Sequence, residues 1–498
     1  MTTTWTEPWR PTFPVATAPT WPLVGAAIGV GVLADQAVRA GVIGLATPVL
    51  VAATTAILLG SGRVVSRESR LLVGAAPLFA MWVMFRTSPW LAPLDLLTAF
   101  GLLLLGCSVA SGGTLTDTRL GQLGARAWHA VGHFMWAGVW PRRLVVSRLS
   151  RSVAPAHRRL RSMVVGAAVA VPVVIGLGAL LASADAVFAS IVRFHVPWDG
   201  AHVGMSVVLI ALGTWTMLGF ARVASAEAPE ALPLPRWRLG RLEFTIVLVA
   251  VDALFALFTV AQLVALSGAG DRILRTAGLS YADYARSGFF QLLWVAGLTI
   301  AGLLALRAAV DHDDAPATRH FRWLALIAIG LTVLIVAAAV RRLMLYEHAY
   351  GLTMLRLYSL LFAAWIGAAL ALFGAEISGV GGHRSWFPAA AGGCALAILF
   401  TLNAVNPEAA VVRHNLNRDN ASVPIDAGYL TDLSDDAVPT LAGLLPRLDP
   451  SVRGDVVAQI CTGDVLDVGA KGPAAWNLSR ARAHKIQTRL CPNGLLGD

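Results

Sequence analysis

Long apolar runs alternate with short polar segments along most of the chain, and this alternation predicts its secondary structure. Each run has roughly the ~20 residues that a helix needs to cross the ~30 Å hydrocarbon layer of a membrane. We therefore predict spans over residues 23–38, 41–60, 71–85, 90–110, 163–182, 202–221, 242–266, 288–306, 323–340, 353–373 and 387–404. The predicted count is eleven, and the third span is the shortest.

The same pattern predicts an all-α fold, in which a polytopic transmembrane bundle is followed by a small helical soluble domain. We divide the chain into five parts. Residues 1–22 form an N-terminal tail, 23–110 the first four spans, 111–162 an arginine-rich segment, 163–404 spans five to eleven, and 405–498 the soluble domain. Helix starts are expected at Asn406-Pro407-Glu408 and Ser434-Asp435-Asp436, since each combines a capping side chain with an early acid.

The composition agrees with a membrane environment. Hydrophobic residues make up 56% of the 498 residues and charged residues only 14%, which is too little charge to coat a soluble protein of this size. The formal net charge is +10, but the basic residues lie between the apolar runs, where they orient helices. We therefore expect the lipid bilayer as the main partner and no nucleic acid.

The distribution of arginine predicts the orientation, because positively charged loops tend to stay on the cytoplasmic side. With the N-terminus inside, the inner segments hold 21 arginines, nine of them between Arg119 and Arg161, and the outer loops hold fewer than half as many. An odd number of spans then places residues 405–498 outside the cytoplasm. We expect a multi-pass protein of the cytoplasmic membrane with its C-terminal domain extracytoplasmic.

Cysteine usage gives a second indication of orientation. Cys107 and Cys394 lie within apolar spans, where cysteine acts as a small core residue. Cys461 and Cys491 are the only two in the soluble domain, and a disulfide between them would close a loop of about 30 residues and stabilise it by ~3–4 kcal/mol. Such a bond needs an oxidising compartment, whereas two unpaired thiols are the alternative.

Residues 111–162 are too polar to cross a membrane and too apolar for a free loop. Tryptophan and phenylalanine interleave there with basic residues, as in Trp128, Trp136 and Trp140 beside Arg126 and Arg142. This pattern is typical of a helix that lies in the headgroup region over anionic lipid. We therefore predict an interfacial anchor.

Asp252 is the strongest single candidate for a functional residue, because it lies near the centre of the predicted span 242–266. An acid at that depth costs ~2.5 kcal/mol or more, so it must be protonated, paired or facing a wet cavity. The functional interpretation is a proton- or cation-linked site. The alternative is a hydrogen bond between neighbouring helices, and the sequence does not separate the two.

Two polar clusters lie at the predicted outer ends of helices. They comprise Tyr281, Tyr284 and Arg286 before the eighth span, and Arg341, Arg342, Tyr346, Glu347, Tyr350 and Arg356 between the ninth and tenth. One interpretation is an interfacial belt with salt bridges, in which Glu347 pairs with Arg286 or Arg356. The other is the mouth of a site for an anionic or lipid-like ligand, because arginine forks bind carboxylate and phosphate.

No motif predicts a metal or a cofactor. The spacing of His195, Asp199 and His202 matches no zinc pattern. His129 and His133 are four residues apart but lack the acid of an H-E-x-x-H motif. The chain also has no P-loop and no G-x-S-x-G, so we expect a non-enzymatic role more than a catalytic one.

Four strings resemble a bacterial multi-pass membrane family: YADYARSGFF (281–290), RLMLYEHAYGLTMLRLY (342–358), NPEAAVVRHNLNR (406–418) and YLTDLSDDAVPTL (429–441). The family is domain of unknown function forty-one seventy-three, which is related to forty-one fifty-three. The resemblance covers about residues 242–445 and implies a bacterial inner-membrane location, but it transfers no catalytic residue. It draws attention to the matching positions Tyr284, Arg286, Glu347, Tyr350, Arg356, Asn406 and Asn415.

Three functions fit these observations. The first is a permease-like or lipid-handling protein in which Asp252 and the polar clusters line a route. The second is a non-catalytic scaffold or envelope sensor, whose external domain docks an envelope protein partner. The third, ranked last, is a glycosyltransferase that uses a lipid-linked donor. Such enzymes typically carry an acid on a substantial first outer loop, whereas the loop after Asp35 is only a few residues long.

Overall fold

A computed structural model of the chain describes residues 16–110, 120–142, 144, 174, 200–227, 239–266, 288–310, 314–382, 385–417, 426–462 and 472–491. Within these residues every regular element is a helix, and β-type pairing is limited to two isolated bridges. Eight of the described helices are long and apolar enough to cross a membrane. The all-helical prediction is therefore confirmed, and the organisation is that of a multi-pass membrane protein.

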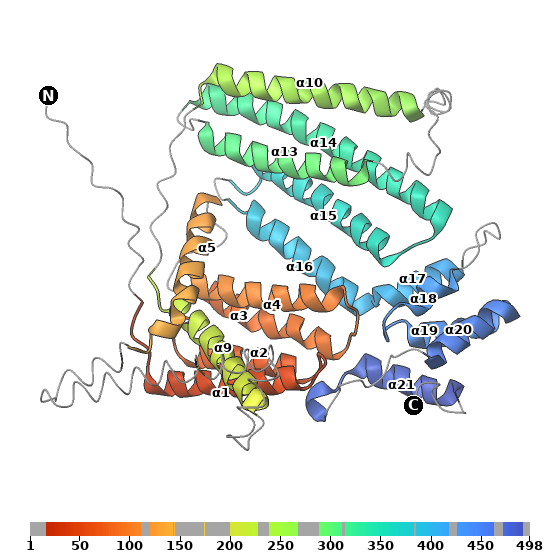
Figure 1. The fold of residues 1–498 in the computed structure, drawn as a ribbon. Coiled ribbons are helices and arrows are strands. Elements are labelled where there is room, and N and C mark those ends of the chain that lie inside the picture. Colours follow the sequence, from red (N-terminus) through yellow and green to blue (C-terminus); the bar gives the residue numbers. More distant parts are fainter. Residues whose placement is uncertain are drawn as a thin grey trace, which may run out of the picture. The chain divides into compact units, whose positions relative to one another are not determined.

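The chain folds into two compact units, which are described one at a time (Figure 1). Unit 1 comprises Met1–Thr114, Gly121–Ala231 and Leu466–Ala481, and unit 2 comprises Leu115–Leu120, Leu232–Val465 and Arg482–Asp498. The predicted soluble domain, residues 405–498, thus contributes residues to both units.

Unit 1 contains the N-terminal helices. They are α1 (Trp21–Arg39), α2 (Ala46–Gly60), α3 (Arg67–Ala80), η1 (Met81–Met84), α4 (Leu91–Ser108), α5 (Leu120–Met135), η3 (Ala137–Val139) and α9 (Gly200–Ala224), with η5 (Pro473–Ala475) packed beside α1 and α2. Ser66 caps α3 by accepting a hydrogen bond from the Ser69 amide, as a residue before a helix often does.

Helices α1 and α9 pack antiparallel at a glycine crossing. Gly31 and Gly213 face each other so closely that a methyl group at Gly213 would come within 2.8 Å of the Gly31 Cα atom. Near the end of α1, Asp35 binds Arg39 at 2.8 Å and accepts a hydrogen bond from Ser206 of α9 at 3.2 Å. At the other end of α1, the Thr17 amide donates to the Ser225 carbonyl. Small residues therefore set the spacing of this helix pair.

Unit 2 contains the remaining helices. They are α10 (Arg241–Leu266), α13 (Phe289–Ala309), α14 (Ala315–Tyr350), α15 (Met354–Ile377), α16 (Phe387–Val405), α17 (Pro407–Leu416), α18 (Ala427–Thr431), α19 (Val438–Leu444), η4 (Leu445–Arg447), α20 (Pro450–Thr462) and α21 (Leu478–Leu490), the last of which begins in the part of the chain assigned to unit 1. One apolar core joins α10, α13, α14, α15 and the start of α16.

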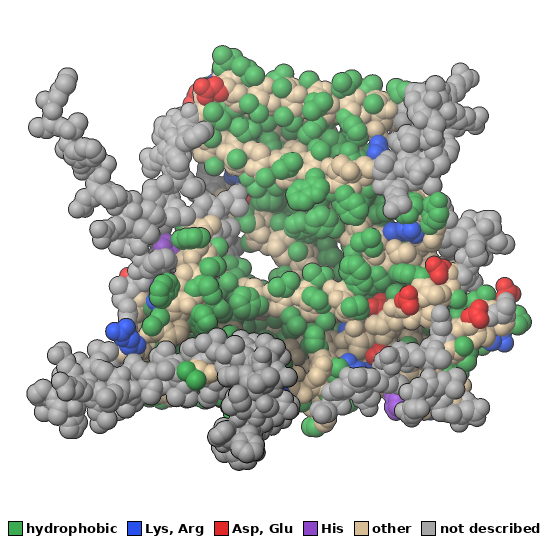
Figure 2. All heavy atoms as spheres, in the orientation of Figure 1, with side chains coloured by type: hydrophobic (Ala, Val, Ile, Leu, Met, Phe, Trp, Pro, Cys, Tyr) green, Lys and Arg blue, Asp and Glu red, His purple; other side chains and the backbone are tan. Residues whose placement is uncertain are grey.

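A second, smaller apolar core holds the short helices that follow α16. Leu430, Leu441, Leu445, Val456 and Ile460 are buried together in it. Figure 2 shows apolar side chains covering α10 and α13, whereas acidic side chains gather over the region of these short helices.

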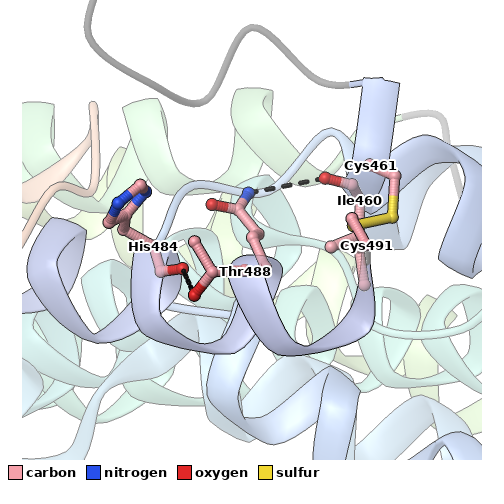
Figure 3. The surroundings of a disulfide bond; sticks show 6 residues. Ile460, Cys461, His484, Thr488 and Cys491 are labelled. Atoms are coloured by element: carbon pink, nitrogen blue, oxygen red, sulfur yellow. Dashed lines mark hydrogen bonds between the residues drawn. A yellow bond between two sulfur atoms is a disulfide. The ribbon is translucent and has the colours of Figure 1, made fainter. Parts of the chain in front are cut away.

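A disulfide joins the ends of two of these short helices. Cys461 of α20 is bonded to Cys491, which follows α21, with their Cα atoms 5.9 Å apart (Figure 3). Beside it, the side chain of Gln487 is fully buried and donates to the Ile460 carbonyl. The bond closes a loop with a sequence separation of 30 residues, so it restrains the C-terminal end of unit 2.

Ten of the eleven predicted spans correspond to described helices. Eight spans fall on the eight membrane-length helices. The spans at 41–60 and 71–85 fall on α2 and on α3 with η1, which are shorter. The fifth predicted span, residues 163–182, lies outside the described residues apart from Val174. The count of eleven therefore stays a prediction.

The glycine crossing can be tested by adding one methyl group. Gly213→Ala forces the backbones of α1 and α9 apart, so we expect it to destabilise the protein by about 1–3 kcal/mol. The measurement is the thermal unfolding temperature of the purified protein in detergent. Gly29→Ala on α1 is the control, because a methyl group there meets nothing within 4 Å. Equal unfolding temperatures for the two variants would contradict the crossing.

Candidate functional site

Asp252 lies on the face of α10 that packs against α14. The two helices run in parallel, because Phe244 packs edge-on against Phe321 near their starts and the Arg342 side chain donates to Gln262 at 3.2 Å near their ends. The offset between these pairs places Asp252 level with residues 329–332 of α14. Asp252 is 9% exposed and lies between the buried residues Leu248 and Phe255 of its own helix.

The carboxyl group of Asp252 is isolated within the protein. Both of its oxygens are buried, and neither has a hydrogen-bond partner among the described residues. Thr332 is the fully buried polar residue at this level of α14, but its hydroxyl donates to the Ala328 carbonyl at 2.6 Å. Of the three states open to an acid in a membrane, the described surroundings provide no pairing, which leaves protonation or a water-filled cavity.

Helix α14 continues beyond the membrane. Its 36 residues make it about 54 Å long, against ~30 Å of hydrocarbon, so one or both of its ends project into the headgroups or water. The helix ends at Gly351, whose φ of +83° is a conformation that favours glycine. The chain then turns, and Thr353 caps α15 by accepting a hydrogen bond from the Arg356 amide.

Polar side chains fasten the following short helices to this turn. The Asn415 side chain of α17 accepts from the Leu352 amide and donates to the Leu352 carbonyl, both at 2.8 Å. The Tyr429 hydroxyl of α18 accepts from the Met354 amide at 2.7 Å. Burial raises the pKa of Tyr429, so its phenol stays neutral at physiological pH. We call this contact the turn joint and define it by Glu347, residues 351–354, His414, Asn415 and Tyr429.

Glu347 contributes a close contact with a histidine to the turn joint. It is 9% exposed, and its carboxylate lies 2.6 Å from His414 Nε2 of α17. The sequence suggested Arg286 or Arg356 as its partner. Arg286 lies outside the described residues. The Arg356 guanidinium donates to the Gly351 carbonyl and not to Glu347, so the predicted pairing of Glu347 with Arg356 is wrong. The reason is that α17 folds back onto α14, which places His414 closer.

The arginines of the second predicted cluster have separate roles. The Arg356 guanidinium lies over the Tyr346 ring at 4.3 Å, near Tyr350, and donates to the Gly351 carbonyl. Arg342 binds Gln262 of α10, whereas Arg341 is exposed. These contacts favour the structural interpretation of the cluster over a mouth for an anionic ligand. Tyr281 and Tyr284, with Arg286, lie outside the described residues.

Several buried polar residues were not singled out from the sequence. Glu408 is 1% exposed and accepts from both the amide and the hydroxyl of Ser434, at 2.8 and 2.7 Å. Glu376, also buried, binds Arg307 of α13 and the Phe387 amide that starts α16. Glu408 lies inside one of the family-like strings, which was its available signal. Glu376 lies in none of them and shows no motif.

The segment predicted to be an interfacial anchor contains helix α5 of unit 1. The rings of Phe134, Phe100 of α4 and Phe220 of α9 pack against one another in a cluster of three. Burial first, and then the nearby charges of Arg222 and His129, lower the pKa of His133 to about 4, so it is neutral at physiological pH. Among the described residues no group of three potential metal ligands occurs. The residues His195 and Asp199 lie outside them.

The fold and the turn joint together define a helical multi-pass membrane protein with short helices fixed to one end of a bundle. The chain belongs to the family described as Domain of unknown function (DUF4153), whose model matches residues 73–444. This confirms the family resemblance, specifically to the second of the two related families, and extends it toward the N-terminus. Comparisons with curated proteins and with solved structures found no match.

The turn joint can be tested through Asn415. Asn415→Ala removes both bonds to Leu352 and leaves a backbone amide and carbonyl unpaired, so we expect a local cost of about 2 kcal/mol. The measurement is deuterium uptake in α17 and α18. Asn417→Ala is the control, because Asn417 is exposed and its side chain accepts only a 3.4 Å contact from Arg447. Equal uptake in both variants would contradict the assignment.

Proposed function

We propose that this protein is a permease-like component of the bacterial cytoplasmic membrane, and that Asp252 is its protonatable residue. The observation that carries the proposal is the isolated Asp252 carboxyl group, buried against α14 without a partner among the described residues. Ionisable groups within membrane spans are expensive and mark functional sites by default. An asparagine or leucine would satisfy packing alone at lower cost, so the presence of an acid at this position supports a role for a change of charge.

The proposed cycle has two states. In the closed state Asp252 is protonated, because an ionised carboxylate would need partners that the α10–α14 contact does not supply. Loss of the proton leaves a buried charge, which favours separation of the two helices until water or a cation reaches it. The Arg342–Gln262 bond at the end of the pair then acts as a fixed point, and the turn joint holds the end of α14.

The permease proposal predicts a pH-dependent opening that a neutral side chain removes. In the wild-type protein, deuterium uptake in α10 and α14, corrected for intrinsic exchange rates, should rise with pH more than uptake in α15. In Asp252→Asn this excess should disappear, because the side chain is neutral at every pH. The measurement is hydrogen exchange with mass spectrometry over a pH series.

The matched control for Asp252→Asn is Glu243→Gln. Glu243 is an exposed acid in the first turn of the same helix, where its carboxylate caps the Gly240 amide, a role that glutamine also fills. This variant should keep the wild-type pH response. A pH response that is the same in wild type and Asp252→Asn would rule out Asp252 as the titrating group.

We also propose that the N-terminus is cytoplasmic and that the short helices after α16 are extracytoplasmic. The arginine bias of the loops supports this orientation. The Cys461–Cys491 disulfide supports it independently, since such bonds persist in oxidising compartments.

The orientation predicts a specific labelling result. A membrane-impermeant thiol reagent added to spheroplasts should label Cys461 and Cys491 only after reduction, because the disulfide blocks them until then. Labelling that needs membrane permeabilisation instead of a reductant would place these cysteines in the cytoplasm. The double variant with serine at both positions is the control for labelling at Cys107 and Cys394.

A second candidate function is an envelope scaffold or sensor that docks a protein partner. The turn joint favours it, because side chains of α17 and α18 bind the backbone at the end of α14 and would transmit a displacement of the short helices. If the protein acts as a scaffold or sensor, Asp252→Asn leaves that function intact, whereas removal of residues 424–498 abolishes it.

A further inference from the structure

A polar hollow lies where several helix ends of unit 1 meet. The starts of α1 and α3 and the ends of α2, α4 and α9 surround an open hollow of about 550 Å³. Its polar lining comes from the side chains of Thr17, Ser61, Arg63, Ser66 and Ser225, and Val65 lies at its edge. The side chain of Val65 is 64% exposed. Arg63 supplies the charge in this lining.

Among the described residues, only neutral groups hold Arg63 in place. Its guanidinium donates to the Thr17 hydroxyl at 3.2 Å, the Ala18 carbonyl at 3.1 Å and the Ser225 hydroxyl, and it lies 5.4 Å from the Trp140 ring centre. A guanidinium has five N–H donors, and among the described residues Arg63 uses three. Two donors on a fixed cation are therefore left for a ligand.

No acid of the described residues neutralises Arg63. Glu68, in the first turn of α3, interacts electrostatically with Arg126 instead. Glu227, just after Ser225, is exposed and forms no ion pair with Arg63 in the described part of the chain. Burial lowers the pKa of Arg63, but an arginine stays charged at physiological pH. Within the described part of the chain, the hollow thus presents a positive charge whose partners are neutral, which is suited to an anion.

The serine hydroxyls of the lining already donate hydrogen bonds to backbone carbonyls. Ser61 donates to the Leu58 carbonyl at 2.7 Å, Ser66 to the Val109 carbonyl at 3.1 Å, and Ser225 to the Ala221 carbonyl. They therefore build the walls and position the backbone. Recognition of the anion depends on Arg63.

The segment beside this hollow has the pattern of a helix that lies among lipid headgroups. Helix α5 and η3 expose a stripe of large apolar side chains that includes Trp128, Val131 and Trp136, the two tryptophans 62% and 61% exposed. An amphipathic helix of this kind lies at the boundary between headgroups and acyl chains. Trp140, which follows η3, donates to the Thr17 carbonyl and lies beside Arg63. The hollow therefore adjoins the interfacial segment.

We propose that this hollow binds the phosphate of an anionic lipid headgroup, with Arg63 as the charged anchor. This end of unit 1 is the one whose loops we assign to the cytoplasmic side, where the leaflet carries anionic lipid. The site does not depend on Asp252 or on the permease proposal. A free phosphate has the same recognition chemistry, so the test separates the two sources.

The test measures the unfolding temperature of the purified full-length protein in neutral detergent as lipid is added. Phosphatidylglycerol should raise it saturably, whereas phosphatidylcholine and inorganic phosphate should not. Arg63→Gln should weaken the apparent affinity for phosphatidylglycerol about tenfold, as expected for one charge-assisted contact. Arg67 is an exposed arginine at the same end, so Arg67→Gln is the matched control. It should change the apparent affinity for phosphatidylglycerol about twofold or less.

A second variant keeps the test decisive if Arg63→Gln does not fold. Val65→Glu adds a carboxylate at the exposed edge of the hollow and should abolish the phosphatidylglycerol response, whereas Val65→Gln should retain it. An unchanged response in Val65→Glu or in a folded Arg63→Gln would overturn the site. Arg63-dependent stabilisation by inorganic phosphate, with none by phosphatidylglycerol, would overturn its assignment to lipid.

Discussion

Hydrocarbon offers no hydrogen-bond partner, so each polar group in a membrane span must find one inside the protein. Most described polar side chains in the spans meet this constraint locally: Thr332 and Asn403 donate to the carbonyl four residues earlier, and Glu376 binds Arg307 and the start of α16. Asp252 is an exception among them, because both of its carboxyl oxygens are buried and neither has a partner among the described residues. The functional account depends on that exception.

The same constraint explains why polar networks concentrate at helix ends. In unit 2 the turn joint uses side-chain oxygens and nitrogens of Asn415 and Tyr429 to satisfy the backbone where α14 stops and α15 starts. In unit 1 the Arg63 hollow lies where helices begin and end, and its walls are hydroxyls bonded to final-turn carbonyls. In each unit, the polar side-chain networks described above therefore lie at the ends of the long apolar helices.

The sequence predicted what depends on local pattern and missed what depends on tertiary pairing. Eight spans and the cap at Asn406 follow from periodicity and capping residues, and each is found. Ser434 was expected to start a helix, but it binds Glu408 and α19 begins later, at Val438. The pairing of Glu347 with His414, 67 positions apart, follows from how α17 folds back, which no local signal encodes.

The account depends on hydrocarbon surrounding the exposed faces of the long helices, such as α10, while α14 shields Asp252. Spin labels at Leu254 and Leu257, which are 62% and 68% exposed on α10, test it most directly in a reconstituted bilayer. The account predicts strong relaxation of both labels by dissolved oxygen and little by a water-soluble nickel chelate. Strong relaxation by the chelate at both positions would show that this face meets water, and would contradict the account.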